Sequence, residues 1–208
     1  LPSMAFSLMI ALAAYRWVKP TWLQAVLLCT MVTVGAVWTH ERNTVYSDRV
    51  TFWQDCVDKS PRKARPHNNL GVALADEGYH DEAIKKYHKA LEIDPLYQDP
   101  VANIGLSLAQ QGKIKESITQ FLKAVEMNPK DSKTLNNLGA SLIVEKRHAE
   151  AIQHLSKALT INPYYAQAHN NMGVALQHQG RFEEAIEHFS MAVLLNPDYT
   201  QAYINLGN

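Results

Sequence analysis

The chain has 208 residues, of which 20 are lysine or arginine and 20 are aspartate or glutamate, so its formal net charge is zero. A neutral balance leaves no electrostatic footprint for nucleic acid, and we expect no nucleic-acid partner. The two cysteines, Cys29 and Cys56, lie in different sequence contexts and show no metal-ligand spacing. They therefore predict neither a metal site nor a disulfide.

The N-terminal region differs from the rest of the chain in composition. Residues 1–40 contain only two charged side chains, Arg16 and Lys19, whereas the rest has a mixture of charges typical of soluble proteins. Residues 21–38 form an uncharged run which, as a helix, spans roughly 27 Å, close to the thickness of the hydrocarbon core of a bilayer. We therefore predict a transmembrane helix over about 21–39.

A buried core helix and the core of a signal peptide are the alternatives for residues 21–38. Trp22 and Trp38 stand at the ends of the run, where interfacial aromatic residues belong, and this favours the membrane. A signal peptide needs a cleavage site of small residues, which the sequence around Trp38 does not provide.

Residues 1–15 are also apolar, but short, and we interpret them as the end of a membrane helix that starts upstream. Residues 16–20 then form a tight loop with two positive charges and no negative one. The positive-inside tendency places this loop in the cytoplasm and the residues after the second span in the periplasm or lumen. Residues 1–43 are thus predicted to be a transmembrane helical hairpin in contact with lipid.

Residues 44–63 join this hairpin to the rest of the chain. Within them, Ser47–Ser60 has the pattern of an amphipathic helix, with Ser47 as its N-terminal cap. Val50, Trp53 and Val57 fall on one face of this helix.

From residue 64 onward the sequence repeats itself every 34 residues. An asparagine, an apolar residue and a glycine recur in five copies. A period of this length indicates antiparallel helix pairs that stack into a solenoid. We predict an all-α superhelix over 64–208, preceded by the membrane hairpin. Its four full repeats are 64–97, 98–131, 132–165 and 166–199, followed by a partial one at 200–208.

Other columns keep the same step and explain how each helix pair is built. In the first repeat, helix A is expected over 64–77 and helix B over 80–93. Gly71 lets the two helices approach closely, and Tyr87 is the large side chain that fills the space beside this contact. Pro95 ends helix B, because proline lacks a backbone donor and disfavours helix in the residue before it.

The columns resemble the tetratricopeptide repeat (TPR), through Leu70-Gly71, Gly78-Tyr79, Tyr87 and Pro95 and their equivalents. The third repeat departs from the pattern. It has Lys146 where its siblings have the loop glycine, and Leu155 in the aromatic column. A left-handed backbone at Lys146 costs about 1 kcal/mol, so we predict the third repeat to be the least stable.

The same period extends back into residues 44–63. Thirty-four residues before Tyr87 and Pro95 stand Trp53 and Pro61. The helix at 47–60 is thus predicted to be a helix B in register with the array, and the end of the membrane helix takes the place of its helix A.

The first 71 residues carry a second resemblance, to the junction between membrane domain and repeats in TPR-containing O-mannosyltransferase-like enzymes and their bacterial relatives. The residues that carry it are Leu1-Pro2-Ser3-Met4, Arg42-Asn43, Trp53, Lys59-Ser60-Pro61 and Asn68-Asn69-Leu70-Gly71. It implies a parent enzyme that transfers a sugar from a polyprenyl-phosphate donor on the non-cytoplasmic side. The catalytic acidic residues of that family lie in a membrane domain outside this chain, so no catalytic residue is predicted here.

The sixth place of every repeat is an asparagine. We name this set the ladder asparagines: Asn69, Asn103, Asn137, Asn171 and Asn205. Helices A line the inner wall of such a superhelix, where a row of amides can pair with the backbone of an extended peptide. The row resembles that of the cytosolic O-GlcNAc transferase, which implies polypeptide binding. The alternative is that these amides satisfy neighbouring backbone groups between helices A.

Three of the preceding places are asparagine too, and we predict that they bind peptide together with the ladder. We name them the partner asparagines: Asn68, Asn136 and Asn170. Other residues expected on the groove wall are Arg65, Asp76, Gln110, Lys133, Gln177 and His178. Because the fifth place holds no basic cluster, a clamp for a terminal carboxylate is rejected. The nine histidines are interpreted as solvated surface, and no metal or cofactor is predicted.

Two functional hypotheses follow. The first is a membrane-tethered scaffold that holds polypeptide in its groove, as the C-terminal part of a polytopic protein glycosyltransferase. The second is a non-catalytic, membrane-anchored adaptor in an envelope assembly complex.

Overall fold

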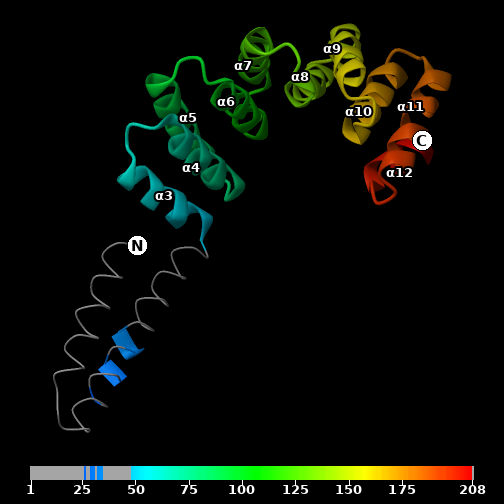
Figure 1. Ribbon diagram of the computed structural model, residues 1–208. Helices are drawn as coiled ribbons and strands as arrows, with labels where there is room; N and C mark the ends of the chain where they lie inside the picture. Colours follow the sequence, from blue (N-terminus) through cyan, green and yellow to red (C-terminus); the bar gives the residue numbers. More distant parts are fainter. Residues whose placement is uncertain (1–25, 27–28, 31, 35–47, 208) are drawn as a thin grey trace. The chain divides into compact units, whose positions relative to one another are not determined.

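The computed structural model describes residues 26, 29–30, 32–34 and 48–207, and all regular structure in that part is helical (Figure 1). Contacts within the chain divide it into two compact units, residues 1–52 and 53–208. The predicted membrane helices at 1–15 and 21–39 lie almost wholly outside the described residues. No helix in the described residues is long and apolar enough to cross a membrane. The membrane hairpin therefore stays a prediction.

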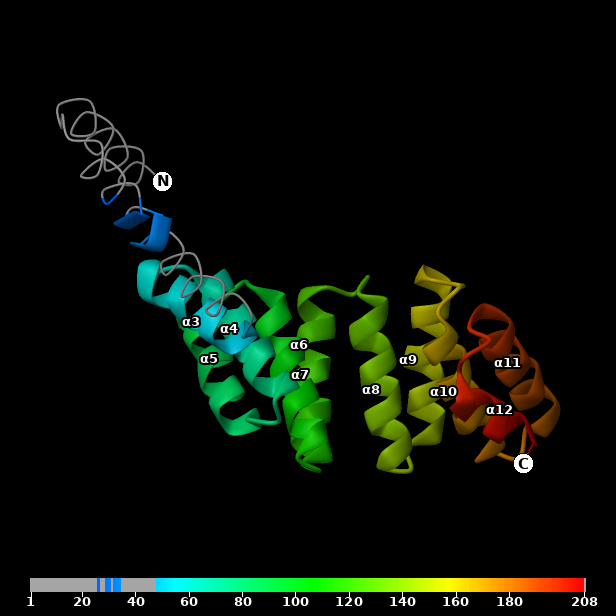
Figure 2. The same cartoon turned by 90° about the horizontal axis from the view of Figure 1, so that it is seen from below.

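The helices of the repeats follow one another in antiparallel pairs (Figure 2). The helices A are α4 (Ala64–Asp76), α6 (Gln98–Gln110), α8 (Ser132–Val144), α10 (Ala166–Gln177) and α12 (Thr200–Gly207). The helices B are α5 (His80–Ile93), α7 (Ile114–Met127), α9 (His148–Ile161) and α11 (Phe182–Leu195). The predicted all-helical TPR solenoid is confirmed.

The helix before the array, α3, spans Arg49–Lys59. Its N-terminal cap is Asp48, whose carboxylate accepts hydrogen bonds from the backbone N–H groups of Val50, at 3.0 Å, and Thr51, at 3.2 Å. The prediction of Ser47 as the cap was wrong by one residue. Both residue types cap helices well, and the sequence pattern cannot choose between neighbours.

Each helix pair closes on the contact between a glycine and a large apolar side chain. A Cβ atom added to Gly71 would lie 2.5 Å from Cε1 of Tyr87, and one added to Gly105 would lie 2.8 Å from Cδ1 of Phe121. The same arrangement joins Gly139 to Leu155. Because real Cβ atoms do not approach so closely, any side chain at these glycines would push the two helices apart.

The loop between helices A and B needs a left-handed residue. Gly78 has φ 85° and the N–H of Tyr79 donates to the carbonyl of Leu74 at 2.9 Å, which closes helix A in a Schellman motif. In the third repeat Lys146 adopts the same conformation, with φ 60°. The left-handed backbone expected at this lysine is thus present, and it costs about 1–2 kcal/mol relative to glycine.

Candidate functional site

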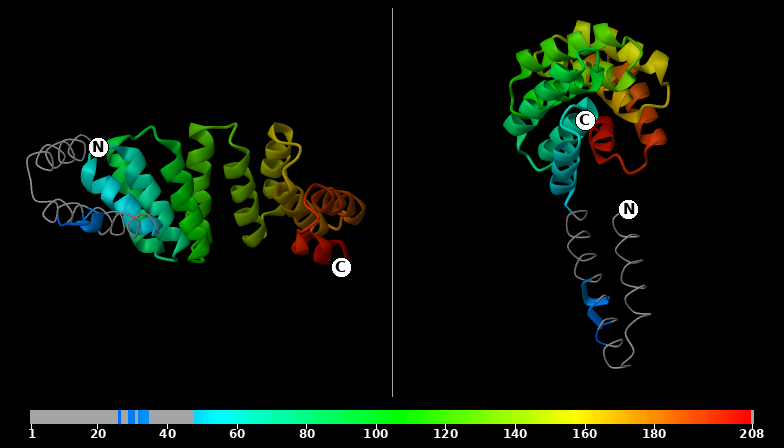
Figure 3. Two further views of the ribbon diagram at one scale, coloured as in Figure 1. Left: turned by 60° about the horizontal axis from the view of Figure 1, so that its bottom comes forward. Right: turned by 60° about the vertical axis from the view of Figure 1, so that its left-hand side comes forward.

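The helices A form the inner wall of the repeat domain. Each of α4, α6 and α8 contacts the next helix A, and a hydrogen bond from Asn205 to Asn170 joins α12 to α10. In Figures 1 and 3 these helices lie on the inner side of the curve, with the helices B outside. The inner wall is therefore a continuous surface built from one face of every helix A.

The ladder asparagines are half-buried on this wall, and the partner asparagines are buried, each 4% exposed. The two sets bond across repeats. The Nδ2 of Asn103 donates to Oδ1 of Asn68 at 3.0 Å, and the corresponding bond from Asn205 to Asn170 is 2.9 Å. Asn171 makes the same bond to Asn136, at 2.9 Å. Each ladder amide so bonded ties its helix A to the one before it.

These bonds leave part of the amide unused in the first four ladder asparagines, whereas Oδ1 of Asn205 also accepts from Nε2 of Gln201 at 3.1 Å. The Oδ1 atoms of Asn103 and Asn171 accept no hydrogen bond from the residues that the structure describes, so each keeps a free acceptor. Asn69 and Asn137 are oriented the other way, because their Oδ1 atoms accept from Asn68 and Asn136, at 3.3 and 3.4 Å. Their Nδ2 groups are the unused donors, so acceptors and donors alternate along the first four repeats.

Tyrosines that stand just before a helix A complete this network. Nδ2 of Asn136 donates to the hydroxyl of Tyr165 at 3.5 Å, and burial raises the pKa of Tyr165. Tyr97 stands at the equivalent place before α6 and interacts with Asn68, and burial raises the pKa of Tyr97 too. Both rings help to hold a partner asparagine in place.

Exposed apolar side chains follow two of the ladder asparagines, one or two helical turns later. Leu106, three residues after Asn103, is 42% exposed, and Val144 at the end of α8 is 62% exposed. The sequence analysis missed both. The signal was present in the spacing, because residues three or seven positions apart share one helix face. The groove wall thus offers aliphatic surface beside the amides.

The other residues predicted on the groove wall differ in their exposure. Arg65, Asp76, Gln110 and Lys133 are exposed, whereas Gln177 is half-buried. His178 is exposed but stacks on His148, with their ring centroids 4.6 Å apart.

The interpretation of the histidines as solvated surface was wrong for His67 and His169, which are both buried. Each donates from Nε2 to a backbone carbonyl at 3.0 Å, His67 to Pro61 and His169 to Pro163. The other ring nitrogen of His169, Nδ1, lies 2.9 Å from Nδ1 of His188. No group of three or more metal-ligating side chains comes together within the described ranges.

Comparison with known protein families identifies the repeats. Profiles described as "Tetratricopeptide repeat" match residues 64–97, 101–131, 120–153 and 166–199, and one described as "TPR repeat" matches residues 145–180. Together with the helix pairs, these matches show that the chain contains an array of tetratricopeptide repeats.

Solved structures share the fold. YrrB, described as a TPR protein with an unusual peptide-binding site, is 22% identical with a TM-score of 0.64, over 80% of this chain and 88% of that one. MamA is 18% identical with a TM-score of 0.65, over 76% and 93%. The protein TTC0263 of Thermus thermophilus is 14% identical, with a TM-score of 0.64 over 76% and 87%.

One curated relative is similar in sequence. A protein O-mannosyl-transferase of Caenorhabditis elegans is 29% identical over 98 residues, which are 47% of this chain. The match covers 14% of that enzyme's length.

Proposed function

We propose that this chain is a membrane-tethered TPR scaffold whose inner wall binds an extended polypeptide. The observation that carries the proposal is the row of half-buried ladder asparagines with unused amide groups, an acceptor on Asn103 and Asn171 and a donor on Asn69 and Asn137. A polypeptide backbone carries one N–H and one C=O per residue, so it complements such a row whatever its side chains.

Two further observations support a polypeptide as the ligand. The aliphatic surface of Leu106 and Val144 beside the amides can receive apolar side chains. The description of YrrB refers to a peptide-binding site on the same fold.

The tether and the parent protein are parts of the same proposal. The uncharged run at 21–38 has the length and flanking tryptophans of a membrane span. The similarity to an O-mannosyl-transferase, together with the junction residues, supports a polytopic glycosyltransferase as the parent. In this arrangement the repeats stand in the periplasm or lumen and present polypeptide to the membrane-embedded enzyme.

Capture of a permanently unfolded polypeptide tests the groove. Reduced, carboxymethylated α-lactalbumin is the probe, and replacing Asn103, Asn137 and Asn171 with alanine is expected to weaken its binding at least tenfold. The measurement is the dissociation constant by fluorescence anisotropy.

The matched control replaces the three partner asparagines with alanine. Each loss of a ladder bond lowers the free energy of unfolding by about 1 kcal/mol, while the ladder asparagines remain in the groove. This variant is expected to melt earlier and still bind the probe. Undiminished binding by the first variant, with its helices intact, would show that the ladder is purely structural.

Flotation on lipid vesicles tests the tether. The chain of residues 1–208 is expected to float with the vesicles after a wash with alkaline carbonate, because a spanning helix resists that wash. The chain of residues 44–208 is expected to stay in the soluble fraction. If the longer chain is also released by carbonate, the transmembrane part of the proposal is wrong.

A further inference from the structure

The ladder of amides is interrupted at one step. Asn103, Asn171 and Asn205 each donate to a partner asparagine in the preceding repeat. Asn137 has no such partner, because the fifth place of the second repeat is Ala102. Its Nδ2 group bonds nothing among the residues that the structure describes.

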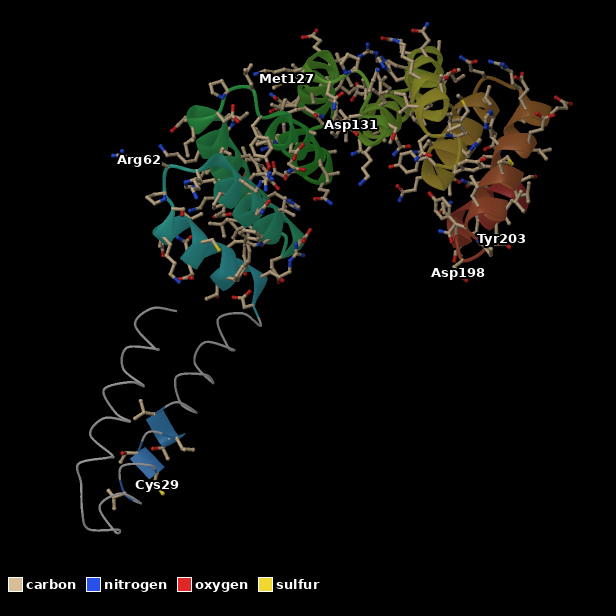
Figure 4. The ribbon with its side chains drawn as sticks, viewed as in Figure 1. Cys29, Arg62, Met127, Asp131, Asp198 and Tyr203 are labelled. Carbon is tan, nitrogen blue, oxygen red and sulfur yellow. The ribbon has the colours of Figure 1, made fainter. Side chains whose placement is uncertain are left out.

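The residue just before the helix A also differs at this step. Before α6 and α10 stand Tyr97 and Tyr165, which interact with the partner asparagines Asn68 and Asn136, but the residue before α8 is Asp131 (Figure 4). Its carboxylate is turned to other groups, accepting from the N–H of Lys133 and from Nε2 of Gln98, both at 3.0 Å. Burial raises the pKa of Asp131, but the hydrogen bonds from Thr134 and Gln98 outweigh it and leave the pKa lowered.

The partner asparagine and the tyrosine are therefore both missing at this step. At the first and third repeats a carboxamide and a tyrosine ring fill the space beside the ladder asparagines, whereas here a methyl group and an engaged carboxylate take their places. We name this place the ladder gap. It consists of Ala102 and Asp131, with Asn103 and Asn137 on either side.

The chemistry of the ladder gap fits a peptide backbone. Asn103 on α6 offers an unused acceptor and Asn137 on α8 an unused donor, and these two helices are in contact. Leu106 and Val144 lie one and two turns further along the same helix faces, both exposed. The charged groups here are Asp131, whose carboxylate already accepts hydrogen bonds from Gln98 and Lys133, and the exposed side chain of Lys133 beside it, so both signs of charge are present.

We infer that the ladder gap is the point at which the groove holds its polypeptide. A backbone N–H donates to Oδ1 of Asn103, the C=O of the same extended segment accepts from Nδ2 of Asn137, and an uncharged aliphatic side chain packs against Leu106. This inference rests on the proposed polypeptide-binding function and adds the place, the contacts and the kind of segment. At the bridged steps Nδ2 of the ladder asparagine already donates to a partner asparagine.

Closing the gap tests the inference. In Ala102→Asn, the new carboxamide is placed to accept from Nδ2 of Asn137, as Asn68 does from Asn103. Affinity for the carboxymethylated α-lactalbumin probe is expected to fall at least tenfold, with a melting temperature equal to or above that of the wild type. The same change at Ala109, two turns along the same face of α6, is the control and is expected to leave the affinity within twofold.

A second variant covers the case in which Ala102→Asn does not fold. Asn137→Asp keeps the oxygen that accepts from Asn136 but loses the free donor, and it is expected to weaken binding at least tenfold. Asn69→Asp makes the identical change beside Asn68, at a ladder asparagine outside the gap, and is expected to weaken binding by a smaller factor than Asn137→Asp does.

The outcomes distinguish the inference about the ladder gap from the proposed binding of polypeptide in the groove. If the wild type binds the probe and both Ala102→Asn and Asn137→Asp bind it equally well, the ladder gap is wrong and the groove proposal stands. Equal losses in Asn69→Asp and Asn137→Asp would also overturn the gap, since binding would then be spread along the whole ladder. A folded wild type that binds no probe overturns both.

Discussion

Replacing Phe121 with alanine is expected to lower the free energy of unfolding by about 3–5 kcal/mol, the range for large aromatic side chains in a core. Phe121 is 1% exposed and belongs to the buried cluster that joins the second, third and fourth repeats. Its ring lies against Gly105, where a Cβ atom would stand 2.8 Å away. Gly105→Ala is expected to cost about 1–3 kcal/mol by forcing this contact open.

The losses in free energy of unfolding caused by Phe121→Ala and Gly105→Ala are expected not to be additive. Without the ring, the new methyl group of Gly105→Ala has space, so the double variant should be more stable than the sum of the single variants predicts. Urea unfolding followed by circular dichroism measures all three. Gly207→Ala is the control, because a Cβ at Gly207 meets nothing within 4 Å. Strict additivity would contradict the contact between glycine and ring as the origin of the effect.

The features that the sequence predicted are those that depend on distance along the chain. The 34-residue column gave α5 its bounds, His80–Ile93, and placed Gly71 against Tyr87. The left-handed backbone at Lys146 followed from the loop glycines of its siblings. Each of these is settled within one helix pair, where sequence spacing and distance in space are closely linked.

One missed feature also lies within a single repeat and could have been found. The residue before each proline that ends a helix B is Asp94, Asn128, Asn162 or Asn196, and its side chain accepts from the backbone N–H two residues on. This is the Asx turn that short acidic or amide side chains form. The signal is a further 34-residue column beside the prolines.

The pairing of the amides could not be predicted in the same way. Asn103 bonds Asn68 and not Asn69, the residue one period earlier, and so the bond joins places 35 residues apart. Which of the two neighbours is reached depends on the rotation between successive helices A, and the linear pattern does not contain this angle. The ladder asparagines were identified as a row from sequence, but their partners and the ladder gap needed coordinates.

Mild acid is expected to destabilise the third and fourth repeats. Three histidines there have a pKa below the ordinary value of 6.5, in each case first because of burial. For His148 the neighbours His178 and Lys146 lower it further, and for His188 the neighbour His169 does. For His154 the charge of Lys157 acts in the same direction and that of Glu150 opposes it.

The contacts of His169 determine which ring nitrogens of His169 and His188 carry protons. Nε2 of His169 must donate to Pro163, because a carbonyl only accepts, so Nδ1 of neutral His169 accepts from Nδ1 of His188. Glu184 and Glu187 favour the charged form of His188, but burial and His169 outweigh them.

The sign of the pH dependence follows from these directions. A histidine with a lowered pKa binds fewer protons in the folded state than in the unfolded one, so its contribution to stability is present above about pH 6.5 and is lost as the pH falls from there through the lower pKa of the folded state. The melting temperature is therefore expected to fall between pH 7.5 and pH 5.5. Hydrogen exchange should place the loss in α9, α10 and α11 before α4 and α5.

The variant His148→Asn, His154→Gln, His188→Gln is expected to flatten this dependence, because amides of similar size keep hydrogen-bonding capacity and do not titrate. His88→Gln, which changes an exposed histidine on α5, is the control and should keep the wild-type slope. Carboxylates such as Glu150 and Glu184, whose pKa values are lowered by hydrogen bonds from Arg147 and Arg181, lose their charge only at lower pH. An unchanged slope in the triple variant would therefore place the acid sensitivity elsewhere than in the histidines of the third and fourth repeats.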